Sequence, residues 1–130
     1  MASTIDEAAR LALGLPETSE GTRFRNRTWI VAGKAFAWER PLSKADIKRY
    51  GDAPLPSGPI VAVSVGDLSE KEAVLATNTP GFFTIEHFAN YPAILIQLDQ
   101  VSPEALREAI VDAWLACAPP ALAADYLAAS

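Results

Sequence analysis

The chain has 130 residues, of which 50% are hydrophobic and 21% charged, and its formal net charge is −5 at pH 7. This apolar content excludes a disordered chain, and the length corresponds to a single domain over residues 1–130. The chain has one cysteine and one histidine, so we expect no disulfide, no metal and no cofactor. It has no apolar run of membrane-spanning length, and its acidic N-terminus is unlike a secretory signal. We therefore expect a cytoplasmic protein without membrane contact.

The first predicted element is a helix over residues 3–15. Thr4 and Glu7 have the spacing of a capping box, in which each side chain bonds the backbone of the other. Gly14 and Pro16 mark the end of the helix, because glycine ends helices and proline cannot continue them.

Three strands joined by tight turns are predicted next. We expect the first at Gly21–Arg27. The second and third, Thr28–Val31 and Lys34–Arg40, flank Ala32-Gly33 and read as a hairpin with a short glycine-containing connection.

The rest of the chain alternates between helix and strand. We first expect a short helix over 43–50 capped by Ser43, a proline-rich loop over 51–59 and a strand at Ile60–Val65. A helix from a Ser69 cap to about Asn78, a brief extended piece at Phe82–Ile85 and a turn at Asn90-Tyr91-Pro92 follow. The last expected elements are a strand at Ala93–Leu98, a helix from Ser102-Pro103 to about Cys117 and a helix over 120–128. This order contains more strands than βαβ crossovers, which join parallel strands, could connect. The sequence therefore predicts an α+β fold of two layers, an antiparallel sheet with helices packed on one face.

Positive charge is concentrated in one part of this acidic chain. Residues 21–50 hold eight cations against Glu39 and Asp46. The cations are Arg23, Arg25, Arg27, Lys34, Arg40, Lys44, Lys48 and Arg49.

The three arginines before Thr28 alternate along the chain. In a strand, Arg23, Arg25 and Arg27 would project from one face about 6.5–7 Å apart. In the third strand, Lys34, Phe36, Trp38 and Arg40 would likewise share a face. Arginines beside aromatic rings are typical of surfaces that bind phosphates and stack bases.

A structural interpretation of the same residues stays open. Most arginines on strands are simply solvated, and Trp29, Phe36 and Trp38 are more typical of a core than of a stacking surface. The overall acidity also opposes long-range attraction of DNA. The predicted nucleic-acid-binding set is Arg23, Arg25, Arg27, Lys34, Trp38, Arg40, Lys48 and Arg49.

No residue is predicted to be catalytic. His87 and Tyr91 lie in a polar, aromatic loop, and we interpret them as a brace for the following strand, with a ligand site in a cleft beside them as the alternative. Cys117 lies on the inward face of its helix and is expected in the core. No phosphate loop, GxSxG, HExxH or GxGxxG motif occurs.

Four segments of the chain resemble the MmcQ/YjbR family of small bacterial proteins. They are Leu13-Gly14-Leu15-Pro16-Glu17, the hairpin from Trp29 to Ala37, the loop His87-Phe88-Ala89-Asn90-Tyr91-Pro92, and the tail Ala113-Trp114 with Cys117-Ala118-Pro119 and Leu122. They occur in the family's order and span roughly residues 5–123. The proline-rich stretch 41–59 matches no family pattern.

The resemblance implies a compact α+β fold similar to secretion chaperones, a DNA-binding role that rests on structural analogy, and no cofactor or enzymatic activity. We therefore expect a non-enzymatic DNA-binding protein whose binding is weak and sensitive to salt. The alternatives are a protein-interaction module that binds a partner chain at a strand edge, and a small-molecule binder that uses a cleft near His87.

Overall fold

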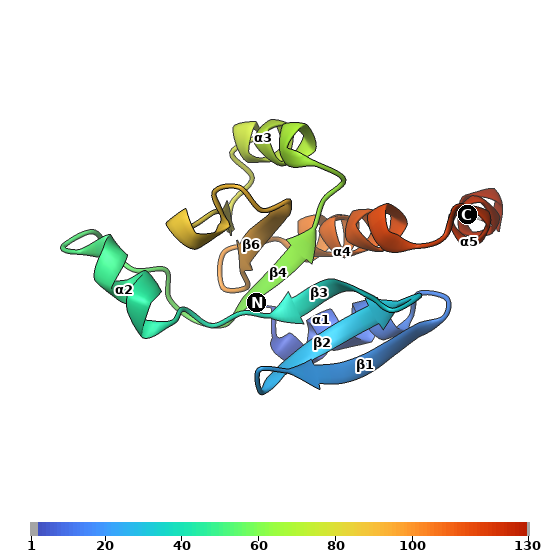
Figure 1. Ribbon diagram of the computed structural model, residues 1–130, viewed down its shortest axis with the longest axis horizontal. Helices are drawn as coiled ribbons and strands as arrows, with labels where there is room; N and C mark the ends of the chain where they lie inside the picture. Colours follow the sequence, from blue (N-terminus) through green and yellow to red (C-terminus); the bar gives the residue numbers. More distant parts are fainter. Residues whose placement is uncertain (1–2, 130) are drawn as a thin grey trace.

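An antiparallel sheet of six strands organises residues 3–129, the part of the chain that the computed structural model describes (Figure 1). The strands lie in the order β1-β2-β3-β4-β6-β5, and every neighbouring pair is antiparallel. Helices and strands are mixed along the chain without parallel crossovers, which confirms the predicted α+β class.

The elements follow one another nearly in the predicted order. The strands are β1 (Thr18–Arg23), β2 (Asn26–Val31), β3 (Lys34–Glu39), β4 (Ile60–Ser64), β5 (Phe82–Phe83) and β6 (Ala93–Gln97). The helices are α1 (Ile5–Leu13), α2 (Lys44–Tyr50), α3 (Leu68–Ala76), the 3-10 helix η1 (Glu86–Phe88), α4 (Pro103–Cys117) and α5 (Pro120–Ala129).

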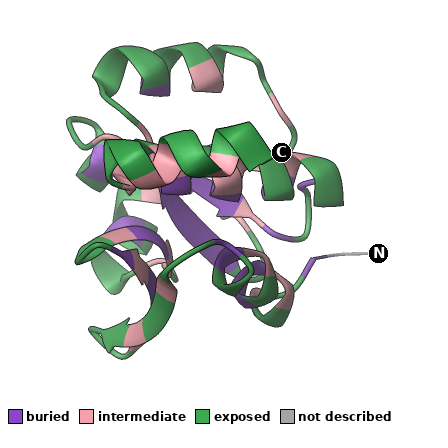
Figure 2. Cartoon of the chain, turned by 90° about the vertical axis from the view of Figure 1, so that its right-hand side faces the viewer, coloured by how far each residue is buried: buried purple, intermediate pink, exposed green. Residues whose placement is uncertain are grey.

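The larger core lies between one face of the sheet and the helices α1 and α4. Trp114 of α4 is fully buried, its indole N–H donates to the Pro16 carbonyl at 3.1 Å, and its ring packs on Tyr126 of α5. Cys117 is half-buried against the same cluster, as expected. Figure 2 shows the buried residues gathered on the central strands, whereas the surrounding helices turn mostly exposed surfaces outward.

A β-bulge in β3 divides its side chains between the two faces. Trp29 pairs with Ala37 and Ile30 with Ala35, so Phe36 has no partner in β2. Phe36 and Ala37 both enter the larger core, and Trp38 packs against the opposite cluster. The prediction that Phe36 and Trp38 share a face is therefore wrong, because the bulge resets the alternation between them.

The second face of the sheet carries a smaller core. Ile60 and Ala62 of β4 and Ala93 and Leu95 of β6 are buried there, together with Phe88 of η1. The half-buried Trp38, Leu42, Tyr50 and Phe83 pack around this cluster. This face therefore holds an apolar base beside η1 and the chain that leads into α2.

Two predicted boundaries are wrong. β1 ends at Arg23, and β2 begins at Asn26, so Gly21–Arg27 is the end of one strand, a turn and the start of the next. The α3 helix begins earlier than Ser69, because Asp67 caps it by accepting from the Glu70 backbone N–H at 2.8 Å. The caps predicted at Thr4, Ser43 and Ser102 are confirmed.

Candidate functional site

A pocket of about 640 Å³ opens on the face of the sheet that carries the smaller core. Its walls come from the β1–β2 turn, β2, β3, the segment that leads into α2, and the η1 loop. The lining residues are Arg23, Phe24, Asn26, Thr28, Ala35, Trp38, Arg40, Pro41, Leu42, Ser43, His87, Phe88 and Tyr91. Two arginines are among them and no carboxylate is, although the chain carries a net charge of −5.

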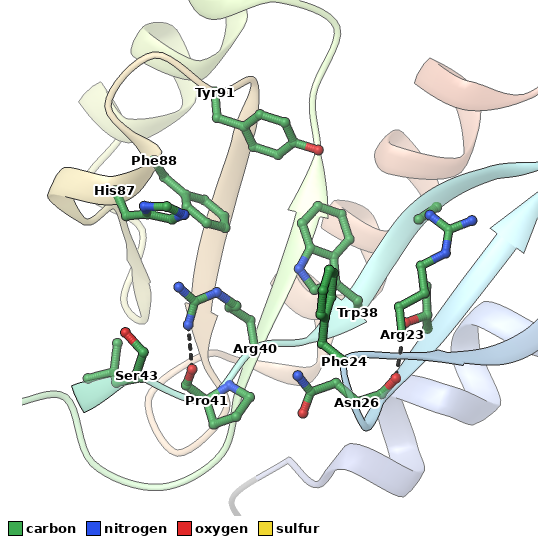
Figure 3. Close-up of a pocket in the computed structure, with 13 residues that line it drawn as sticks. Arg23, Phe24, Asn26, Trp38, Arg40, Pro41, Ser43, His87, Phe88 and Tyr91 are labelled. Atoms are coloured by element: carbon green, nitrogen blue, oxygen red, sulfur yellow. Dashed lines mark hydrogen bonds between the residues drawn. The ribbon is translucent and has the colours of Figure 1, made fainter. Parts of the chain in front are cut away.

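Aromatic rings form a connected wall of this pocket. Trp38 meets Tyr91 edge to face with ring centroids 6.4 Å apart, and Tyr91 meets Phe88 in the same manner at 5.4 Å. The His87 ring lies 6.0 Å from that of Phe88. Figure 3 shows Phe24 and Trp38 on one side and His87 and Phe88 on the other. Such a wall offers flat apolar faces to a ligand ring.

The Arg40 guanidinium is fixed in place at the edge of this wall. Arg40 Nη2 lies 3.0 Å from Asp46 Oδ2, Arg40 Nη1 donates to the Pro41 carbonyl, and the group stands 5.4 Å from the Phe88 ring centroid (Figure 3). Asp46 also accepts from the Ser43 backbone N–H at 2.9 Å as part of the α2 capping box. The α2 N-terminus therefore positions a cation in the pocket.

Lys71 ties the η1 loop to α3. This lysine is 5% exposed, and its Nζ donates to the Phe88 carbonyl and, at 2.9 Å, to the Tyr91 carbonyl. Burial lowers the pKa of the Lys71 ammonium. That His87 and Tyr91 brace this loop stays a prediction: both rings contact Phe88, the exposed His87 ring makes no hydrogen bond within residues 3–129, and Lys71 holds the two carbonyls.

The predicted arginine ladder is divided by the turn. Arg23 ends β1 and lines the pocket, Arg25 lies in the turn, and Arg27 belongs to β2. Arg27 bonds both carboxylate oxygens of Glu20 at 3.0 Å and Asp6 at 2.8 Å, and these contacts raise the pKa of Arg27. Arg27 is therefore already paired, at a place outside the pocket.

The other predicted cations are spread over the surface. Lys34 is exposed and follows the second hairpin turn, and Lys48 is exposed on α2. Arg49 pairs with Asp46 at 3.5 Å and lies 4.0 Å from Glu86. Of the ten predicted site residues, the pocket brings together Arg23, Trp38, Arg40, His87 and Tyr91. Whether any of the ten binds a ligand stays a prediction.

Several pocket and support residues were missed. Phe24 stands between two arginines, which was a signal for an exposed ring. Ser43 and Asp46 have capping-box spacing. Lys71 shares a helical face with Val74 and Leu75, which indicated an inward lysine. The contact of Phe88 with Arg40 depends on tertiary packing and had no sequence signal.

Neither a metal site nor a membrane-spanning helix occurs in the part of the chain that the structure describes. Residues 3–129 contain no group of three or more His, Cys, Asp or Glu side chains placed to hold a metal ion. Within the same residues, every helix is too short or too polar to traverse a bilayer. β1 is an edge strand of the sheet, and its use for strand addition by a partner chain stays a prediction.

Comparison with known proteins assigns a family but no activity. Residues 13–116 match the model of the YjbR family. Three relatives, from Mycobacterium bovis and two strains of Mycobacterium tuberculosis, are each named an uncharacterized protein. Each is 42% identical to this chain, and the match covers 98% of both sequences. No solved structure matches the chain significantly.

Proposed function

The chain belongs to the YjbR family, and from its pocket we propose that it binds nucleic acid. The observation that carries the proposal is the lining itself, which combines Arg23 and Arg40 with aromatic rings and excludes carboxylates. Arginine binds phosphate through charge-assisted hydrogen bonds, and aromatic rings stack on bases. Both halves of a nucleotide therefore find a matching group in one pocket.

The two arginines differ in what they can contribute. Arg23 is exposed and makes no ion pair within residues 3–129, so its guanidinium is free to contact a phosphate. Arg40 is held by Asp46 and has N–H groups left over, since the guanidinium carries five. Two phosphate contacts give only modest affinity, because the rest of the acidic surface repels a polyanion.

Salt dependence follows from the number of contacts. Each phosphate that is neutralised on a single strand contributes about 0.7 to the slope of log affinity against log salt. Contacts from Arg23 and Arg40 therefore predict a slope of about −1.4. We expect measurable binding at about 20 mM salt and a large loss at physiological salt.

The test is fluorescence anisotropy of a labelled twelve-nucleotide strand, titrated with the parent protein, Arg23→Ala and Lys34→Ala. Both variants remove one exposed cation, but only Arg23 lines the pocket. Arg23→Ala should weaken binding severalfold and reduce the slope by about 0.7, whereas Lys34→Ala should leave the slope unchanged. Equal losses in both variants would mean that binding is diffuse, and no binding by the parent at low salt would refute the proposal.

A small phosphorylated ligand with an aromatic ring is the second candidate. The pocket volume of about 640 Å³ lies within the range of about 300–1,000 Å³ that holds small molecules. A mononucleotide competitor separates the two functions. If a mononucleotide displaces the labelled strand as well as an unlabelled strand does, the small-molecule function is favoured.

A further inference from the structure

The β1–β2 connection has an unusual sequence for its geometry. Arg23 pairs with Asn26, so the turn consists of Phe24 and Arg25 alone. Both have positive φ, at 51° and 67°, as in a type I′ turn. This turn strongly favours Asn-Gly, because ordinary L-residues are strained there. The turn therefore keeps two residues that are poorly suited to its backbone.

The strained turn also holds an aromatic ring out in water. Phe24 is 95% exposed, and each of the other large hydrophobic side chains that the structure describes is 57% exposed or less. A ring in this position contributes nothing to the core. Strained backbone that the fold itself does not need is concentrated at ligand clamps and active sites in proteins.

The exposed ring stands at the pocket. Phe24 lines it together with Arg23 and Asn26 on either side of the turn, and the half-buried Trp38 lies on the same side (Figure 3). No ring contact joins Phe24 to Trp38 within residues 3–129, so the exposed Phe24 ring and the part of Trp38 that lines the pocket are open to a ligand. Arg23 lines the pocket beside this ring, Arg25 is exposed in the turn, and neither arginine makes an ion pair within residues 3–129.

We infer that the Phe24–Arg25 turn is a base clamp, and that the pocket accepts an unpaired nucleobase stacked on Phe24 and Trp38. This inference rests on the proposed function and specifies its substrate class. The bases of a duplex are stacked on one another and present only their edges in the grooves, so their faces cannot reach these rings. Single strands leave their bases free to stack on aromatic side chains. The clamp therefore selects single strands over duplexes.

The decisive experiment compares three probes of equal length. They are a single strand, its duplex, and a single-stranded backbone whose bases are replaced by abasic sites. We expect the parent protein to bind the single strand at least about tenfold more tightly than either of the others, because only this probe offers stacking. Ribose and deoxyribose versions of the single strand identify which nucleic acid is preferred.

Phe24→Asn removes the ring and keeps the turn, because asparagine is favoured at this φ. This variant should lose the preference for the single strand, about tenfold, whereas Phe24→Trp should retain it. If Phe24→Asn binds all three probes as the parent does, or if the parent binds the duplex as tightly as the single strand, the clamp is refuted while nucleic-acid binding stands. If the parent binds none of the probes, both inferences fail.

Discussion

Asp46 organises the charged edge of the pocket although its side chain is only 2% exposed. Burial alone would raise the pKa of Asp46, but hydrogen bonds from Ser43 and Arg40 outweigh that effect and hold the pKa below its ordinary value of 3.8. The folded state therefore favours the ionised carboxylate. This contribution to stability is present above the unfolded pKa and is lost as the pH falls through the lower, folded pKa.

The first prediction is that Asp46→Asn lowers the free energy of unfolding by about 1–3 kcal/mol at pH 7, because Arg40 loses its buried carboxylate partner. As the pH falls from the ordinary pKa of 3.8 through the lower, folded pKa of Asp46, the parent also loses this charge, so the difference between the two proteins should shrink. Urea melts at several pH values measure both effects. The control is Asp125→Asn, which changes an exposed carboxylate on α5. A difference that stays constant down to the lowest pH would contradict this account.

The second prediction concerns the core. Trp114→Ala should cost about 3–5 kcal/mol, because it removes a fully buried indole that packs on Tyr126. Trp114→Phe should cost less, since a ring remains in the space. Denaturant melts measure both changes, and a loss below about 1 kcal/mol for the alanine variant would mean that the site collapses around the missing ring.

Among the elements, the η1 loop is held by a contact from α3 in addition to its own backbone hydrogen bonds. Lys71 donates to two carbonyls of this loop, at Phe88 and Tyr91. Both of these residues line the pocket. The position of one wall is therefore set by a helix that does not itself line the pocket.

The third prediction is that Lys71→Met loosens residues 86–91, because methionine fills the space but removes the two hydrogen bonds that tie this loop to α3, and the Phe88 and Tyr91 carbonyls keep only their backbone partners. The loss of stability should be about 1–3 kcal/mol, because two hydrogen bonds worth about 0.5–1.5 kcal/mol each are removed. Amide hydrogen exchange should accelerate in this loop more than in β4. Glu72→Gln, a change at the exposed neighbour of Lys71, is the control and should leave exchange in the loop unaltered.

The two hairpin turns offer a matched pair for the fourth prediction. Phe24-Arg25 and Ala32-Gly33 both have positive φ at both positions, but only the first turn lines the pocket. Replacing Phe24-Arg25 by Asn-Gly should raise the free energy of unfolding by about 1 kcal/mol through relief of strain, and should weaken binding of a single strand. Ala32→Asn should also stabilise the protein but leave binding intact. Weakened binding in both variants would show that the turns affect the site only indirectly.

The order of elements was predictable because local signals for the caps and strands agree with the fold. The β1–β2 turn was missed because it contains neither glycine nor asparagine, so Gly21–Arg27 looked like one strand. The face of Trp38 was missed because the bulge at Phe36 depends on pairing with β2. The partners of Arg27 come from α1 and β1, and such contacts follow from tertiary packing rather than from local sequence.

For the molecule as a whole, the cations that the sequence suggested as one basic region lie at separate places in the structure. Arg27 is neutralised by Asp6 and Glu20, and Arg49 is paired with Asp46. Arg23, which has no ion pair in the part of the chain that the structure describes, and the fixed Arg40 remain at a pocket lined by aromatic rings. This arrangement in an acidic protein favours binding of nucleic acid through base stacking and two phosphate contacts over binding through a broad positively charged surface.

Tryptophan fluorescence tests this central claim most directly. Of the three tryptophans, Trp29 and Trp114 are fully buried in the larger core, and only Trp38 is half-buried at the pocket. If bases stack on Trp38, saturating single strand should quench part of the emission of the parent protein, and Trp38→Phe should abolish that change while the two buried tryptophans still emit. Equal quenching in Trp38→Phe, or binding by anisotropy without any quenching in the parent, would contradict the claim that this pocket holds the base.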